Sequence, residues 1–112
     1  MKFALLINDL PGMYDALTPA ERDAVFGEYF AISKDDRVVG GEQLLPAAMA
    51  KTVRASGGET RVTDGPPAST EEVLGGYYVV EVDAVDEALE IATRIPAVRL
   101  GGSVELRPVM ER

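Results

Sequence analysis

Tyr77-Tyr78-Val79-Val80-Glu81-Val82 is the stretch that decides the fold, because β-branched and aromatic residues dominate it and predict a strand. Alternation along a strand divides its apolar side chains between two faces: Tyr78, Val80 and Val82 on one, Tyr77 and Val79 on the other. Apolar side chains on both faces are typical of a strand that is shielded from water on both sides. We therefore expect this strand to lie in a sheet whose two faces are both covered.

A helix is predicted directly after this strand. Asp83 can cap its start, and Asp86 and Glu87 place acidic groups in the first turn, where they suit the helix dipole. Pro96 ends the helix, and the alternating residues 103–107 predict a strand that closes the domain. The apolar stripe of the predicted helix consists of Val85, Ala88, Leu89, Ala92 and Ile95.

The N-terminal half predicts the same order of elements. Residues 3–7 are an apolar run with two apolar faces, which predicts a central strand. Thr18-Pro19-Ala20-Glu21 then combines a capping residue, a proline suited to the first helical position and the glutamate of a capping box. We expect this helix to run to about Asp35, and residues 38–44 to form a strand with a bulge or close backbone approach at Gly40-Gly41. The apolar residues of the helix are Val25, Tyr29 and Ile32, flanked by Phe26 and Phe30.

A hairpin is predicted between the two halves. Residues 51–55 and 59–63 alternate around Ser56-Gly57-Gly58, and their polar side chains indicate an exposed ribbon. Asp64-Gly65-Pro66-Pro67-Ala68 predicts a rigid turn after it. Residues 69–74 are then expected to form one helical turn.

The predicted order of elements is strand-helix-strand, an inserted hairpin, and again strand-helix-strand. This order predicts an α+β domain of the ferredoxin-like type, with both helices on one sheet face. We expect residues 1–112 to form this single domain. The other sheet face would expose the apolar residues of strands 3–7 and 77–82, and such a face usually marks a partner surface. Two sheets packed face to face would bury it, so we expect a homodimer.

Composition excludes several kinds of chemistry. The chain has no cysteine and no histidine, which removes disulfides, thiolates, the usual metal ligand and the usual proton carrier at neutral pH. We expect no metal and no cofactor. The net charge of −8 opposes binding to nucleic acid. The apolar run at the N-terminus stops at Asn8-Asp9, too early for a signal peptide or a membrane span, so we expect a cytoplasmic location and no membrane contact.

Several spaced motifs extend over the whole chain. They are Gly40-Gly41-Glu42, Val62-Thr63-Asp64-Gly65-Pro66, Glu72-Val73-Leu74-Gly75-Gly76-Tyr77-Tyr78, Asp86-Glu87-Ala88-Leu89, Arg94-Ile95-Pro96 and Gly102-Ser103-Val104-Glu105-Leu106-Arg107-Pro108. Together they resemble the YCII-related family, in its DGPF branch. The resemblance implies a ferredoxin-like domain that dimerises into an α/β barrel.

Two positions depart from the pattern of that family. The branch is named for Asp-Gly-Pro-Phe, and Pro67 stands here in place of the phenylalanine, which reshapes any cavity that the loop borders. Some members of the family carry a histidine on the first helix, paired with an aspartate, and are thought to be enzymes on that ground. The first helix here has Glu28 and Tyr29 in that region, so the resemblance does not imply a histidine–aspartate mechanism for this chain.

The candidate site residues lie on the loop around Asp64 and on the strands beside it. Asp64 can be a turn residue that accepts backbone N–H bonds, which is the commoner case, or a site carboxylate. Tyr77 and Tyr78 point to opposite faces, so one hydroxyl can reach a pocket or a second subunit. Arg54 and Arg61 can bind a carboxylate substrate or serve solubility alone. The candidates are catalytic Asp64 and Tyr78 and ligand-binding Arg54, Arg61, Tyr77, Glu42 and Pro67.

Three functions stay open at this point. The first hypothesis is a small-molecule-binding homodimer. The second is a lyase or isomerase acting on a small acidic or aromatic compound in the dimer cleft, with Asp64 as base, a tyrosine hydroxyl as acid and an arginine as anion clamp. The third is a regulatory interaction module linked to transcription, because related domains occur beside sigma factors. A deep apolar pocket with convergent polar groups would favour the first two over the third.

Overall fold

The strand with two apolar faces, β1 (Lys2–Asp9), lies inside the sheet as predicted. In the computed structural model, which describes residues 1–112, β1 pairs with β5 (Val73–Glu81) on one side and β6 (Ser103–Pro108) on the other. β2 (Val38–Gln43) pairs with the far edge of β5, so the strand order is β2-β5-β1-β6 and every pairing is antiparallel. This arrangement is compatible with a ferredoxin-like α+β fold.

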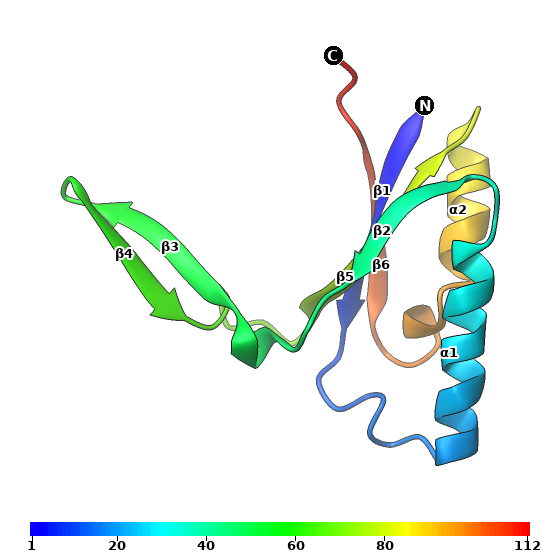
Figure 1. Cartoon of the computed structure of the whole chain (residues 1–112), viewed down its shortest axis with the longest axis horizontal. Helices are drawn as coiled ribbons and strands as arrows, with labels where there is room; N and C mark the ends of the chain where they lie inside the picture. Colours follow the sequence, from blue (N-terminus) through cyan, green and yellow to red (C-terminus); the bar gives the residue numbers. More distant parts are fainter.

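Two helices cover one side of the sheet (Figure 1). The first, α1 (Pro19–Ser33), begins with the predicted capping box: the Glu21 N–H donates to Thr18 Oγ1 at 3.2 Å, and the Thr18 N–H donates to the Glu21 carboxylate at 3.0 Å. The helix ends at Ser33, close to the predicted end at about Asp35, and the Asp35 carboxylate then accepts hydrogen bonds from the Arg37 backbone and guanidinium. Neither helix is long and apolar enough to cross a membrane.

The second helix, α2 (Val85–Thr93), begins differently from the prediction. Asp83 does not cap it. Instead the Glu87 carboxylate reaches back and accepts hydrogen bonds from the Asp83 and Ala84 N–H groups, at 2.9 and 3.2 Å. A short 3₁₀ turn (Pro96–Val98) then follows the helix and leads into β6.

The buried stripe of α2 also differs from the predicted one. Ala88, Ala92 and Ile95 are buried, as expected, but Ile91 joins them, while Val85 and Leu89 are exposed. Positions 88, 91, 92 and 95 follow the i, i+3, i+4, i+7 spacing of a single helix face, which explains the choice. The stripe packs into one hydrophobic core whose buried members are Phe3, Leu5, Ile7, Met13, Ile32, Val80, Val82, Ala88, Ile91, Ala92, Ile95 and Ala97.

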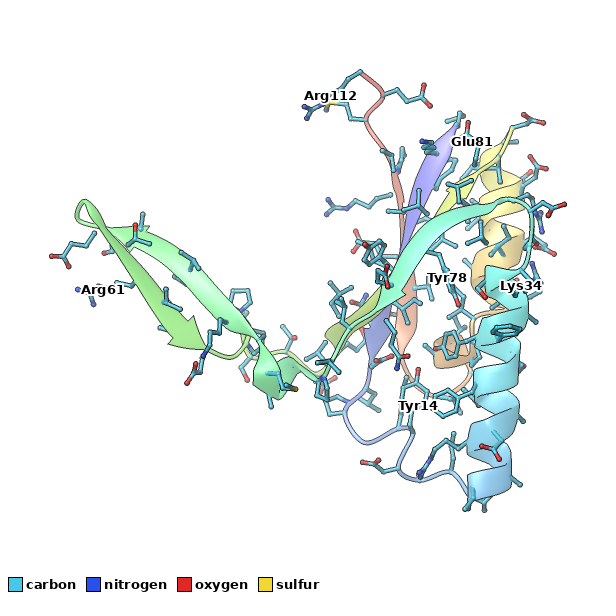
Figure 2. All side chains as sticks on the ribbon, in the orientation of Figure 1. Tyr14, Lys34, Arg61, Tyr78, Glu81 and Arg112 are labelled. Carbon is cyan, nitrogen blue, oxygen red and sulfur yellow. The ribbon has the colours of Figure 1, made fainter.

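The predicted hairpin forms an arm that stands away from the body. Its strands β3 (Lys51–Ser56) and β4 (Glu59–Asp64) make a separate two-stranded sheet, which a 3₁₀ turn (Ala47–Met49) links to β2. The arm projects from the side of the sheet opposite the helices, with Arg61 far out on it (Figures 1 and 2). It raises the radius of gyration to 15.9 Å, above the roughly 13 Å typical of a compact domain of this length.

The helical turn predicted for residues 69–74 is absent. The chain there is irregular, and β5 begins already at Val73 and passes through Gly75-Gly76. Both glycines lie within the strand, where neighbouring groups leave no room for a side chain. A Cβ at Gly76 would lie 3.0 Å from the Glu42 carbonyl oxygen.

Gly41 fulfils the prediction of a close backbone approach in β2. The register of β2 against β5 shifts between Val38 and Gly40, and Gly41 has a φ of +142°. A Cβ on Gly41 would lie 2.4 Å from the Tyr77 carbonyl oxygen, which belongs to the neighbouring strand. Glycine is therefore required there for both space and backbone conformation.

This requirement gives a paired prediction. Gly41→Ala should lower the free energy of unfolding by about 1–3 kcal/mol, because it combines a rare backbone conformation with a clash against backbone. Gly27→Ala, in the middle of α1 and with no atom within 4 Å of the added Cβ, should raise it by about 0.5–1 kcal/mol. Urea unfolding of both variants measures the two effects. Equal changes in both would contradict this account.

Candidate functional site

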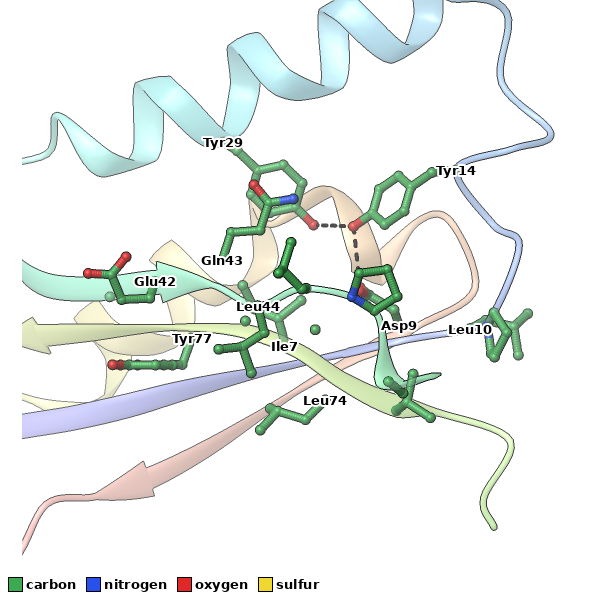
Figure 3. A pocket seen from close by; sticks show the side chains of 18 of the residues that line it. Ile7, Asp9, Leu10, Tyr14, Tyr29, Glu42, Gln43, Leu44, Leu74 and Tyr77 are labelled. Atoms are coloured by element: carbon green, nitrogen blue, oxygen red, sulfur yellow. Dashed lines mark hydrogen bonds between the residues drawn. The ribbon is translucent and has the colours of Figure 1, made fainter. Parts of the chain in front are cut away.

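A cleft of about 910 Å³ opens where the end of β1, the loop after it, α1 and the end of β2 meet (Figure 3). More than half of its lining residues, 13 of 24, are hydrophobic. A few polar side chains converge among them, and these are Asp9, Tyr14, Tyr29 and Gln43. An apolar cleft with few, convergent polar groups is the usual form of a small-molecule site.

Three of these polar groups form a continuous hydrogen-bonded chain. The Tyr14 hydroxyl donates to Asp9 Oδ1 at 3.3 Å, and the Tyr14 and Tyr29 hydroxyl oxygens lie 2.7 Å apart (Figure 3). A hydroxyl has a single hydrogen, and that of Tyr14 is directed to Asp9. Tyr29 therefore donates to Tyr14, and the chain runs from Tyr29 through Tyr14 to the Asp9 carboxylate.

Asp9 is positioned by the end of the central strand. The register of β1 against β5 shifts between Ile7 and Asn8, and Asp9 then pairs with Val73. Gly75 passes directly beside the Asp9 carboxylate, where a Cβ would lie 1.8 Å from Oδ2. The absence of a side chain at Gly75 is therefore what allows the carboxylate to occupy this place.

The two tyrosines come from other elements. Tyr14 follows Met13, which is buried in the core and fixes the loop after β1. Tyr29 lies on α1, and its backbone carbonyl accepts a hydrogen bond from the Tyr78 hydroxyl at 3.0 Å, which ties α1 to β5. The chain of hydroxyls thus depends on three segments that are distant in sequence.

Burial changes the acid–base properties of these groups. It raises the pKa of Asp9, and the hydrogen bond from Tyr14 opposes this increase. Burial is also the main cause that raises the pKa of Tyr14 and of Tyr29, and it raises the pKa of Tyr78 to about 12. The tyrosines consequently stay protonated at neutral pH and act as hydrogen-bond donors, whereas Asp9 is the acceptor of the site.

Three of the predicted site residues line the cleft. Tyr77 and Tyr78 lie on β5, and Glu42 on β2 is the register partner of Tyr77. The hydroxyl of Tyr78, predicted as catalytic, is engaged by the Tyr29 carbonyl, so it connects elements within the fold.

The other predicted residues lie on or beside the arm and do not line this cleft. The Asp64 carboxylate is exposed and accepts a hydrogen bond from the Lys51 ammonium rather than from backbone N–H groups, contrary to the structural role predicted for it. Arg61 is exposed on β4, and Arg54 donates to the Pro67 carbonyl oxygen at 2.7 Å. Pro67 borders a second cavity, of about 700 Å³, at the base of the arm.

Sequence reasoning missed Asp9 and Tyr14. The segment that contains Asp9 was interpreted only as the loop that ends a strand, and Tyr29 only as part of an apolar helix stripe. The available signal was a carboxylate at the end of a strand buried on both faces, since such strand ends often border sites. No three acidic side chains gather closely enough to hold a metal ion.

Comparison with known proteins gives a consistent result over the full length. A family model described as the YCII-related domain matches residues 1–112. A protein of Rhizobium meliloti (strain 1021), named as uncharacterised, is 32% identical over 114 residues, which cover 97% of this chain and 92% of that protein.

The raised pKa of Asp9 predicts a stabilising substitution. In the folded state its ionisation is opposed by burial, so this group lowers stability as the pH rises from the unfolded pKa, about 3.9, through the folded one. Asp9→Asn keeps an acceptor for Tyr14 without a charge, and should melt at a higher temperature than wild type at pH 7.

Thermal unfolding of wild type and Asp9→Asn between pH 3 and 8 tests this, and the difference should vanish at the acidic end. Asp15→Asn, at an exposed position in the same loop, is the matched control and should leave the pH profile unchanged. If Asp9→Asn melts below wild type at pH 7 and this deficit is smaller at pH 3, the predicted direction of the effect is wrong.

Proposed function

Because this chain belongs to the YCII-related family, we propose that it acts as that family's fold suggests, as a homodimer that binds a small molecule. The cleft beside Asp9 is the observation that carries the proposal. The finer placement in the DGPF branch is part of the proposal too, and it is supported by Asp64-Gly65-Pro66.

The size and lining of the cleft support ligand binding. Its volume of about 910 Å³ falls within the roughly 300–1,000 Å³ of small-molecule sites, and its polar groups converge from β1, α1 and the loop between them. A cavity of this kind favours a ligand-binding function over the regulatory interaction module.

The uncovered face of the sheet supports the homodimer. Pairing across the strands places Ala4 beside Val79 and Leu6 beside Tyr77 on the face away from the helices, and all four are only half-buried. Charged residues on the outer strands border this apolar centre, namely Glu42 on β2 and Glu105 and Arg107 on β6. An apolar centre with a polar rim is the usual composition of a protein interface.

The arm supports the same arrangement. It extends from the side of the sheet that carries this apolar face (Figure 1). Val53 and Val62 are direct cross-strand partners on the arm, and they are 63% and 60% exposed. An isolated two-stranded hairpin is only marginally stable in water. A second subunit seated against the sheet would lie within reach of the arm and could cover this valine pair.

We expect Leu6→Asp to convert the protein to monomer, because a charge would be buried at the centre of the interface. Val53→Asp, on the arm, should weaken the dimer without touching the core, which keeps the test valid if Leu6→Asp unfolds. Ala24→Asp, exposed on α1, is the matched control. Sedimentation velocity at micromolar concentration measures all three, and a monomeric wild type would refute the dimer.

A second candidate function is an enzyme of the lyase or isomerase type, favoured by the chain Tyr29–Tyr14–Asp9. Asp9 would take a proton from the substrate, and the hydroxyl of Tyr29 would turn its single hydrogen from Tyr14 to the developing negative charge. Asp9 would then take the role of base that we first assigned to Asp64.

Native mass spectrometry of the purified protein tests binding, with an added mass expected on the wild type. Ala48→Trp should fill the cleft and remove that mass while the subunit state is retained, whereas Ala20→Trp, outside the cleft, should keep it. In deuterated buffer, an enzyme would introduce deuterium into the ligand, and Tyr29→Phe should slow this by at least about tenfold while binding is retained. An added mass that persists in Ala48→Trp would place the ligand elsewhere.

A further inference from the structure

Every charged residue that lines the cleft is acidic. These residues are Asp9, Asp15 and Glu42, and no lysine or arginine is among the lining residues. The chain as a whole carries a net charge of −8, so the surrounding field has the same sign. An anionic ligand would find no positively charged side chain among the residues that line the cleft.

Two arginines next to α1 are committed to ion pairs. Arg99, whose charge acts on Tyr29, makes a two-pronged ion pair with Glu28. Arg37 is paired in the same way with Asp35. Neither of them lines the cleft.

Asp9 consequently lacks a cationic partner within the chain. Its carboxylate takes part in no ion pair, and its only side-chain hydrogen bond comes from the uncharged Tyr14 hydroxyl. A partly buried carboxylate without a cation is costly, and a positive group in the cleft would remove that cost.

Aromatic residues line the same space, and on the helix side of the sheet they are Tyr14, Phe26, Tyr29 and Tyr78. The face of an aromatic ring attracts a cation, and the attraction is stronger where water is excluded. A carboxylate at the end of an apolar, aromatic cleft therefore matches a compound with a positive head and an apolar body.

We propose that the ligand of this cleft is a protonated amine carried on an apolar or aromatic body, with its ammonium group paired to Asp9. This inference rests on the proposed function, because it names the ligand class of that same cleft. It replaces the acidic substrate and arginine clamp of the sequence analysis, since the cleft contains no arginine.

Three probes of matched size test the charge preference: 2-phenylethylamine, 2-phenylethanol and phenylacetate. Isothermal titration calorimetry at pH 7 and low salt should show the amine binding at least about tenfold more tightly than the alcohol, a difference of about 1.4 kcal/mol. Phenylacetate should bind more weakly than both. Asp9→Asn should reduce the affinity for the amine to that for the alcohol, and Asp23→Asn, exposed on α1 outside the cleft, should change neither.

The possible outcomes distinguish a failure of this inference from a failure of the proposed small-molecule binding. Equal binding of amine and alcohol, tighter binding of phenylacetate, or an amine affinity unchanged by Asp9→Asn would overturn the cationic ligand and leave a small-molecule site in place. A wild type that binds none of the three probes and carries no added mass would overturn both proposals together.

Discussion

The structure depends on one constraint, which is that β1 has to be shielded from water on both faces. Phe3, Leu5 and Ile7 point toward the helices and enter the core. Ala4 and Leu6 point the other way and are only half covered by the chain itself. The need to cover Phe3, Leu5 and Ile7 explains why both helices lie on one side of the sheet. The need to cover Ala4 and Leu6 explains why the proposed partner lies on the other side. The same strand ends at Asp9, so its position in the sheet also sets the position of the cleft.

Much of the fold could be predicted because its signals are local. The capping box at Thr18, the alternation in residues 51–64 and the glycines of β2 each determine a few neighbouring residues, and the structure confirms all three. The predictions were wrong where another residue or a contact from a distant segment determined the local structure. Asp83 is a good capping residue, but the helix begins one residue later, with Ala84 as N-cap, and Glu87 accepts from the Asp83 and Ala84 N–H groups. Residues 69–74 were expected to form a helical turn, whereas β5 begins at Val73 and passes Asp9 at Gly75, where only glycine leaves space for the carboxylate.

The candidate site was harder to predict, because its chemistry arises from contacts between distant segments. Asp9, Tyr14 and Tyr29 are ordinary residues in sequence, and no spacing connects a loop tyrosine with a helix tyrosine. Arg54 and Arg61 were chosen as candidates because of their charge, but they lie on the arm and do not line the cleft. Tyr77, Tyr78 and Glu42 line the cleft because the pairing of β2 with β5 places them beside it.

The arm also has a consequence for the order in which the chain folds. β2 can pair with β5 only after residues 44–72 have closed into a loop, and the entropy lost on closure grows with loop length. The hairpin needs only local contacts and forms on a faster timescale than the sheet. Once it has formed, Lys51 and Asp64 are neighbours, and the flexible part of the loop shrinks to the two short segments that flank the arm. Whenever the arm has formed first, the edge strand of the sheet joins at a lower entropic cost than its sequence separation suggests.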